Sequence, residues 1–196
     1  MPPKKKFSKQ QIIDAAFEIA KSEGIEKITI RKVATRLGSS IAPIYVNFND
    51  VNELIGVVVQ KVFDVSQRLL IEQNSGNRFR DIGVASIRFA KGYPHLFRDL
   101  VMNSNDYMKG YDKGMGDELI MHMKKDPTLE GFTEDELKDI LMKMKIFQTG
   151  LTVMVANRLF TDDINEEKMV EILDSAADDV IAAIRLRKKG TLDRKN

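Results

Sequence analysis

Residues 29–48 read TIRKVATRLGSSIAPIYVNF. Thr29 is a suitable helix cap, and the apolar residues behind it recur at the i, i+3, i+4, i+7 spacing of one helix face: Ile30, Val33, Ala34 and Leu37. Gly38-Ser39-Ser40 predicts a tight turn, after which a short helix over residues 41–47 is expected. Two short helices joined by a glycine-containing turn indicate a helix-turn-helix, although an ordinary packed helical hairpin would give the same turn.

The helix expected over 41–47 has a small, apolar beginning, Ser40-Ile41-Ala42-Pro43. Ser40 is the expected cap. Because Pro43 has no N–H, the Ser40 hydroxyl is expected to bond the Ala42 amide. Such a tip suits the methyl groups of thymine in the major groove.

Polar groups flank this tip. Tyr45 and Asn47 follow it and can hydrogen-bond phosphate oxygens, and Arg31 and Lys32 on the preceding helix add positive charge.

Helical spacing continues through nearly the whole chain. Ser8 with Gln11 and Thr133 with Glu136 form capping boxes, and Gly24 is expected to end the first helix in the left-handed conformation. Gly110, Gly114 and Gly116 predict an irregular stretch. Beyond residue 24, the expected helices are 29–37, 41–47, 51–73 (with Asp50 and Glu53 at its start), 78–91, 95–101, 117–125, 134–160 and 165–188.

Composition narrows the class of protein. The 196 residues are 43% hydrophobic, contain no cysteine and include no apolar run long enough to cross a membrane. The basic start lacks the apolar stretch of a secretory signal, so a cytoplasmic location is expected. Residues 1–50 hold nine Lys/Arg and five Asp/Glu, whereas the rest holds 22 and 24. This asymmetry favours a polyanion-binding N-terminal surface, although Lys4, Lys5 and Lys6 can also form a solvated tail.

The chain resembles the tetracycline-repressor (TetR) family of bacterial regulators. The resemblance covers residues 8–60 and rests on Thr29–Gly38, Ser40, Ile44–Phe48, Glu53-Leu54 and the first-helix run Ile12–Phe17. It implies an all-α homodimer with an N-terminal three-helix DNA-binding head (residues 1–50) and a C-terminal helical ligand-binding and dimerisation bundle (residues 51–196).

The resemblance also implies roles for residues of the head. The base contacts would lie near Ser40, Ile41, Ala42 and Pro43. The phosphate contacts would lie near Thr29, Arg31, Tyr45 and Asn47, with Lys32 adding charge beside them. The expected partner is double-stranded DNA, a palindromic operator from which the repressor is released by a small molecule. No cofactor is expected.

Nine of the ten methionines lie after residue 100, and methionine adapts to irregular apolar ligands. The resemblance implies an inducer pocket among the middle helices. Candidate lining residues are Tyr93, His95, Met102, Tyr107, Tyr111, Met115, His122 and Gln148, each of which can equally be a core or surface residue. His122 and Asp126 have metal-ligand spacing but no third ligand in view, so no metal is predicted.

The last two helices carry broad apolar faces with small residues that permit close helix packing: Gly150, Ala156, Ala176, Ala177 and Ala183. A four-helix dimer interface is implied by the resemblance, with closure of a monomeric bundle as the alternative.

Two other classes of function remain as alternatives. One is a protein-interaction module whose head no longer binds DNA. The other is an enzyme using the Met-rich pocket, although the sequence holds no nucleophile elbow, phosphate loop or zinc-protease motif. An enzyme is therefore not predicted.

Overall fold

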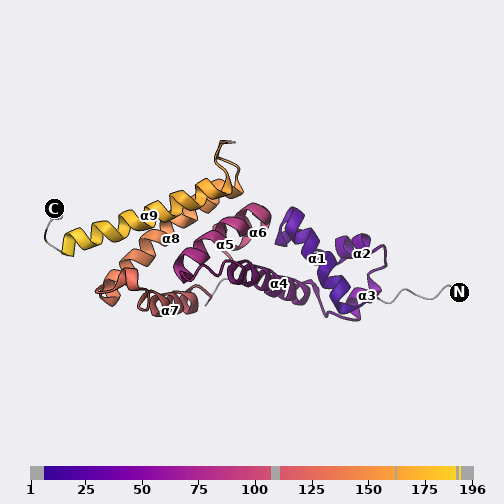
Figure 1. Cartoon of the computed structure of the whole chain (residues 1–196). Coiled ribbons are helices and arrows are strands. Elements are labelled where there is room, and N and C mark those ends of the chain that lie inside the picture. Colours follow the sequence, from indigo (N-terminus) through magenta and orange to yellow (C-terminus); the bar gives the residue numbers. More distant parts are fainter. Residues whose placement is uncertain (1–6, 107–110, 162, 189, 191–196) are drawn as a thin grey trace. The chain divides into compact units, whose positions relative to one another are not determined.

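The computed structural model describes residues 7–106, 111–161, 163–188 and 190, without the side chains of residues 111–115. Every regular element in these ranges is helical, which confirms the all-α prediction. Figure 1 follows the elements along the chain: α1 (Lys9–Glu23), η1 (Ile25–Lys27), α2 (Ile30–Leu37), α3 (Ala42–Tyr45), α4 (Val51–Ile71), α5 (Arg78–Gly92), α6 (Pro94–Phe97), η2 (Arg98–Met102), α7 (Tyr111–Met123), η3 (Pro127–Leu129), α8 (Glu134–Ala156) and α9 (Glu166–Lys188).

The chain divides into two compact units. The first runs to Arg68 and is completed by residues 93–107, whereas the second comprises residues 69–92 and the chain from residue 108 onward. The polypeptide therefore leaves the first unit within α4 and returns to it at α6. The functional boundary predicted at residue 50 is a separate matter and stays a prediction.

The predicted caps of α1 and α8 are confirmed. Ser8 and Thr133 each accept a bond from the backbone N–H three residues on, while the side chains of Gln11 and Glu136 bond back to the cap N–H. Asp50 also caps α4, since its carboxylate accepts from the amides of Asn52 and Glu53.

The end of α1 differs from the prediction. Gly24 has φ 108° and ψ 160°, an extended conformation outside the left-handed helical region and open essentially to glycine alone. The Asp99 carboxylate lies beside it and accepts a bond from the Ile25 amide at 2.6 Å. The chain therefore leaves α1 in a direction that Asp99 fixes, and the left-handed cap prediction is wrong.

Three predicted helix bounds also require correction. Helix α7 begins at Tyr111 and so includes Gly114 and Gly116, where an irregular stretch was expected. Helix α8 ends at Ala156, four residues early. The helix expected over 95–101 is one α-turn, α6, followed by the π-helical segment η2. Glycine lowers helix propensity by only about 1 kcal/mol per residue, which tertiary packing outweighs.

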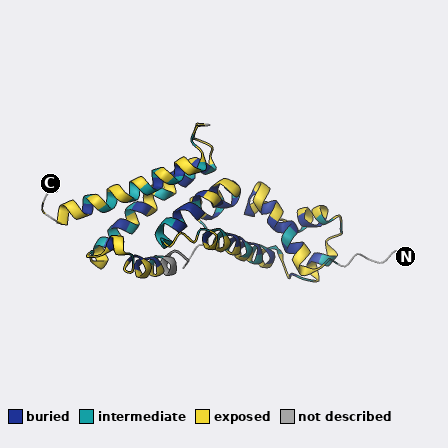
Figure 2. Ribbon diagram, viewed as in Figure 1, coloured by how far each residue is buried: buried dark blue, intermediate teal, exposed yellow. Residues whose placement is uncertain are grey.

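The second unit packs α5 against α8 and α9, with α7 beside α5 and α8. Gly83 on α5 admits Leu173 of α9 so closely that a Cβ atom at residue 83 would lie 2.3 Å from the leucine Cδ2. On the same helix, Ser86 accepts a hydrogen bond from the Gln148 amide of α8 at 2.7 Å. In Figure 2, buried and half-buried residues alternate with exposed ones along α9, as expected for a helix with one packed face.

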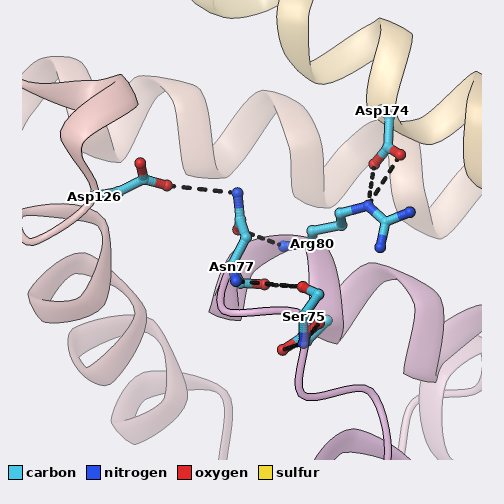
Figure 3. Close-up of polar contacts among 6 residues, drawn as sticks. Ser75, Asn77, Arg80, Asp126 and Asp174 are labelled. Carbon is cyan, nitrogen blue, oxygen red and sulfur yellow. Dashed lines mark hydrogen bonds and ion pairs between the residues drawn. The ribbon is translucent and has the colours of Figure 1, made fainter.

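A polar cluster fixes the start of α5 (Figure 3). The buried Asp81 accepts bonds from the Ser75 amide, and Asn77 caps the helix by accepting from the Arg80 amide. Arg80 pairs with Asp174 of α9 at 3.0 Å. These contacts join the predicted loop 74–77 to the packed helices.

Candidate nucleic-acid interface

Helix α2 begins as the sequence predicts. The Thr29 hydroxyl accepts a hydrogen bond from the Lys32 amide at 3.2 Å, which satisfies one free amide of the first turn. The helix buries Val33 and Ala34 and leaves Arg31 and Lys32 exposed. It therefore braces the head with one face and presents positive charge with the other.

The turn after α2 is tight and depends on one glycine. Gly38 has φ 63° and ψ 36°, the left-handed conformation that glycine adopts at little cost. The amide of Ser39 bonds back to the Ala34 carbonyl at 3.0 Å, which closes the end of the helix. The predicted turn is therefore present, and it directs the chain into α3.

Helix α3 is held by its buried side. Ile44 is fully buried and Phe48 is 2% exposed, so these residues anchor a helix too short to be stable alone. At its far end the Asn47 amide donates to the Pro43 carbonyl at 2.8 Å. The contact of Asn47 with phosphate stays a prediction.

The predicted cap of α3 is wrong. The helix begins one residue later than expected, with Ile41 in the cap position and without a side-chain cap. Ser40 stays exposed, and its carbonyl accepts a bond from the Ser39 hydroxyl at 2.9 Å. Because α3 begins at Ala42, Ser40 lies outside the cap position from which it was expected to bond the Ala42 amide.

The outward face of α3 and the residue after it is mainly apolar. Ile41 is 44% exposed, Tyr45 54% and Val46 85%, with Ala42 exposed beside them. These residues occupy i and i+4 positions of one face, opposite Ile44 and Phe48. Sequence reasoning missed Val46, although its four-residue spacing from Ala42 was a signal that could have found it.

Charges beside α3 are partly engaged within the head. Lys32 forms an ion pair with Glu23 at 2.6 Å, and this hydrogen bond lowers the pKa of the Glu23 carboxyl. Arg36 lies 3.9 Å from Glu18. All four side chains are about half exposed, so these ion pairs are weak.

Residues 93–107 complete the same unit. The Tyr93 ring meets Phe17 of α1 edge-on at 6.3 Å between centroids, and Leu96 and Phe97 of α6 are buried. Lys61 of α4 pairs with Asp14 of α1 and lies over the Phe17 ring. The interface is thus supported by α1, α4 and α6 together.

The residues predicted to bind a ligand fall into both units. Tyr93, His95 and Met102 belong to the first, whereas His122 and Gln148 belong to the second. His122 is exposed, with Glu118 at 3.7 Å, and Gln148 bonds Ser86. Tyr107 lies outside the described residues, as do the side chains of Tyr111 and Met115. Among the described residues, no group of acids and histidines is arranged to hold a metal.

Comparison of the sequence with protein-family models and with curated proteins finds no match. Solved structures do match. A TetR-like transcriptional regulator from Rhodococcus sp. RHA1 aligns with TM-score 0.64 at 14% identity, over 86% of this chain and 92% of the other. The fatty acid degradation regulator FadR from Bacillus halodurans gives 0.58 at 14%, over 90% and 95%. TetR from Acinetobacter baumannii AYE gives 0.55 at 18%, over 93% and 99%.

The chain has the TetR-like fold. Each of these alignments spans most of both chains, so the similarity extends beyond the head to the helices of the second unit. No helix in the described part of the chain combines the length and hydropathy that a membrane span requires.

Proposed function

We propose that this chain is a DNA-binding transcriptional regulator that acts in the cytoplasm as a symmetric dimer. The carrying observation is the geometry of α2, the Gly38 turn and α3. Ile44 and Phe48 hold α3 from behind, so that Ile41, Tyr45 and Val46 face solvent. A short helix braced in this way fits the major groove with its outward side chains toward the bases.

Phosphate contacts would come from the rim of this surface. Thr29 and Arg31 lie at the start of α2, and Lys32 exchanges Glu23 for phosphate when DNA binds. The Tyr45 hydroxyl adds a neutral donor. Each exchange of a counterion for a Lys or Arg contact makes affinity depend on salt.

The dimer would form through α8. Met142, Ile146 and Met154 are 59%, 66% and 38% exposed, and Gly150 stands between them at the same four-residue spacing. A continuous apolar stripe on a long helix favours association with a second copy. Two heads separated by one DNA turn, roughly 34–36 Å, would then read a palindrome.

The regulatory part of the proposal is repression relieved by a small apolar molecule. One similar structure, a TetR variant from Acinetobacter baumannii AYE, is described in complex with minocycline. A ligand of this chain would favour one spacing of the heads over another and so change operator affinity. Chemical catalysis is not part of the proposal.

The test is fluorescence-anisotropy binding to DNA from just upstream of the chain's own gene, at two salt concentrations and against scrambled DNA. Tight binding that falls with salt and exceeds the scrambled control is expected. Tyr45→Ala should weaken it at least tenfold, whereas Met121→Ala, which also truncates an exposed side chain (60%), should leave it unchanged. Equal affinity for every DNA sequence would contradict a regulator and leave only non-specific binding.

A further inference from the structure

The reading face offers few groups that hydrogen-bond bases. Residues 40–46 read SIAPIYV and include no Arg, Lys, Asn or Gln. The amide of Asn47, the next residue, already donates to the Pro43 carbonyl. The usual bidentate contacts to guanine and adenine come from those four residue types. Residues 40–46 therefore hold none of the side chains that usually recognise guanine or adenine through paired hydrogen bonds.

The same face exposes aliphatic carbon instead. Val46 is 85% exposed, the highest value for a large hydrophobic side chain among the described residues, and Ile41 is 44% exposed. Both lie beside the exposed Ala42 on one side of the short helix. Ile44 of the same helix is fully buried, so the exposure of Val46 is not due to general looseness of this segment.

The charge around this apolar face identifies its occupant. Residues 1–50 carry nine basic and five acidic side chains, and Arg31 and Lys32 are exposed on the adjoining helix. A polyanion is attracted to such a rim, and the major groove of DNA offers one apolar feature that distinguishes the bases, the thymine 5-methyl group. An acidic protein surface would lack this combination of phosphate and methyl.

We propose that the head recognises its operator chiefly through thymine 5-methyl groups, with Val46, Ile41 and Ala42 as the residues that contact them. The inference rests on the proposed function, since it assumes that α3 enters the major groove. Specificity then comes from burying methyl carbon, while the phosphate contacts of α2 supply sequence-independent affinity. Burial of one methyl carbon is expected to change the DNA-binding constant by about fourfold.

The test replaces thymidine by deoxyuridine, which removes only the methyl group. Each thymidine of the operator that the anisotropy assay identifies is replaced singly and then together, and the full-length protein is titrated by anisotropy. Some positions inside the half-sites should each weaken binding about fourfold, with losses that accumulate. Replacements outside the half-sites serve as the control and should change nothing.

A variant assigns the methyl contacts to a residue. Val46→Ala should weaken binding to the thymidine operator but leave affinity for the deoxyuridine operator nearly unchanged, since the missing methyl has already removed the contact. Because Val46 is 85% exposed, the melting temperature of the variant should match that of the parent. Equal affinity for thymidine and deoxyuridine operators would overturn the inference alone. Failure to bind the thymidine operator at all would overturn the proposed function and this inference with it.

Discussion

At the residue scale, Asp14 and Lys61 give a testable electrostatic contact between α1 and α4. The hydrogen bond from Lys61 lowers the pKa of the Asp14 carboxyl below its usual value of 3.8, and the Gln10 amide acts in the same direction. A carboxyl whose folded-state pKa is depressed stabilises the fold above its unfolded pKa. That stabilisation is lost as the pH falls through the folded value.

We therefore expect Lys61→Met to raise the Asp14 pKa towards 3.8 and to flatten the acid side of the stability profile slightly. NMR titration of the side-chain carboxyl measures the first effect, and urea unfolding between pH 2 and 5 measures the second. Lys27→Met, which removes an exposed lysine from η1, is the control. An Asp14 pKa that stays low in Lys61→Met would show that the pair is not formed in solution.

At the residue scale, the sequence predicted correctly those features that depend on one local hydrogen bond. Thr29 and Ser8 cap their helices because each needs only an amide three residues away. Prediction failed at Ser40, because α3 begins one residue later than expected, and at Val46, whose exposure depends on how Ile44 and Phe48 are buried.

At the scale of elements, the contact between α5 and α9 depends on the absence of a side chain at residue 83. A Cβ atom there would lie 2.3 Å from Leu173 Cδ2, and Leu173 is 5% exposed. Gly83→Ala should therefore destabilise the protein by about 1 to 3 kcal/mol through overpacking, despite the better helix propensity of alanine.

Gly116 on α7 is the matched control. Outside its own stretch of helix, no atom of the described residues lies within 4 Å of a Cβ built there, so Gly116→Ala should stabilise the protein by about 1 kcal/mol. Chemical denaturation of both variants measures the difference. Two variants that change stability in the same direction and by the same amount would show that α5 and α9 do not pack as described.

The predicted helix bounds were correct where a cap residue begins the helix, and wrong where packing decides how far the helix extends. The starts of α2, α4 and α8 came from cap residues. The glycines at 114 and 116 argued against helix, yet α7 includes them, because the cost of glycine is small beside the burial of Leu119, Ile120 and Met123.

At the scale of the whole molecule, the stripe on α8 is the proposed site of dimerisation. Ile146→Glu would place a charge in the centre of an apolar interface, so the mass in solution should fall from twice 22.3 kDa to 22.3 kDa. Multi-angle light scattering measures the mass, and operator affinity should fall with it.

Met121→Glu, at a position that is also exposed (60%) but lies on α7, should remain dimeric. A parent protein that is already monomeric at micromolar concentration would contradict the dimer. A dimer that survives Ile146→Glu would place the interface elsewhere.

The least predictable feature was the assembly of the first unit from two stretches of chain. Periodicity shows which face of a helix is apolar but not which distant segment covers it. Helix α6 packs on α1, and the apolar Leu96 and Phe97 did not show in the sequence which distant helix would cover them.

The junction of Gly24 and Asp99 has a consequence for how the sequence can evolve. A Cβ atom at residue 24 would lie 2.8 Å from the Asp99 carboxylate, and φ of 108° already disfavours other residues there. Loss of Asp99 would remove one of these two constraints on residue 24, the close approach of the carboxylate. Among orthologues, Gly24 and Asp99, which lie 75 positions apart along the chain, should be kept together or lost together, so that their covariation records whether η2 still meets the end of α1 in a given lineage.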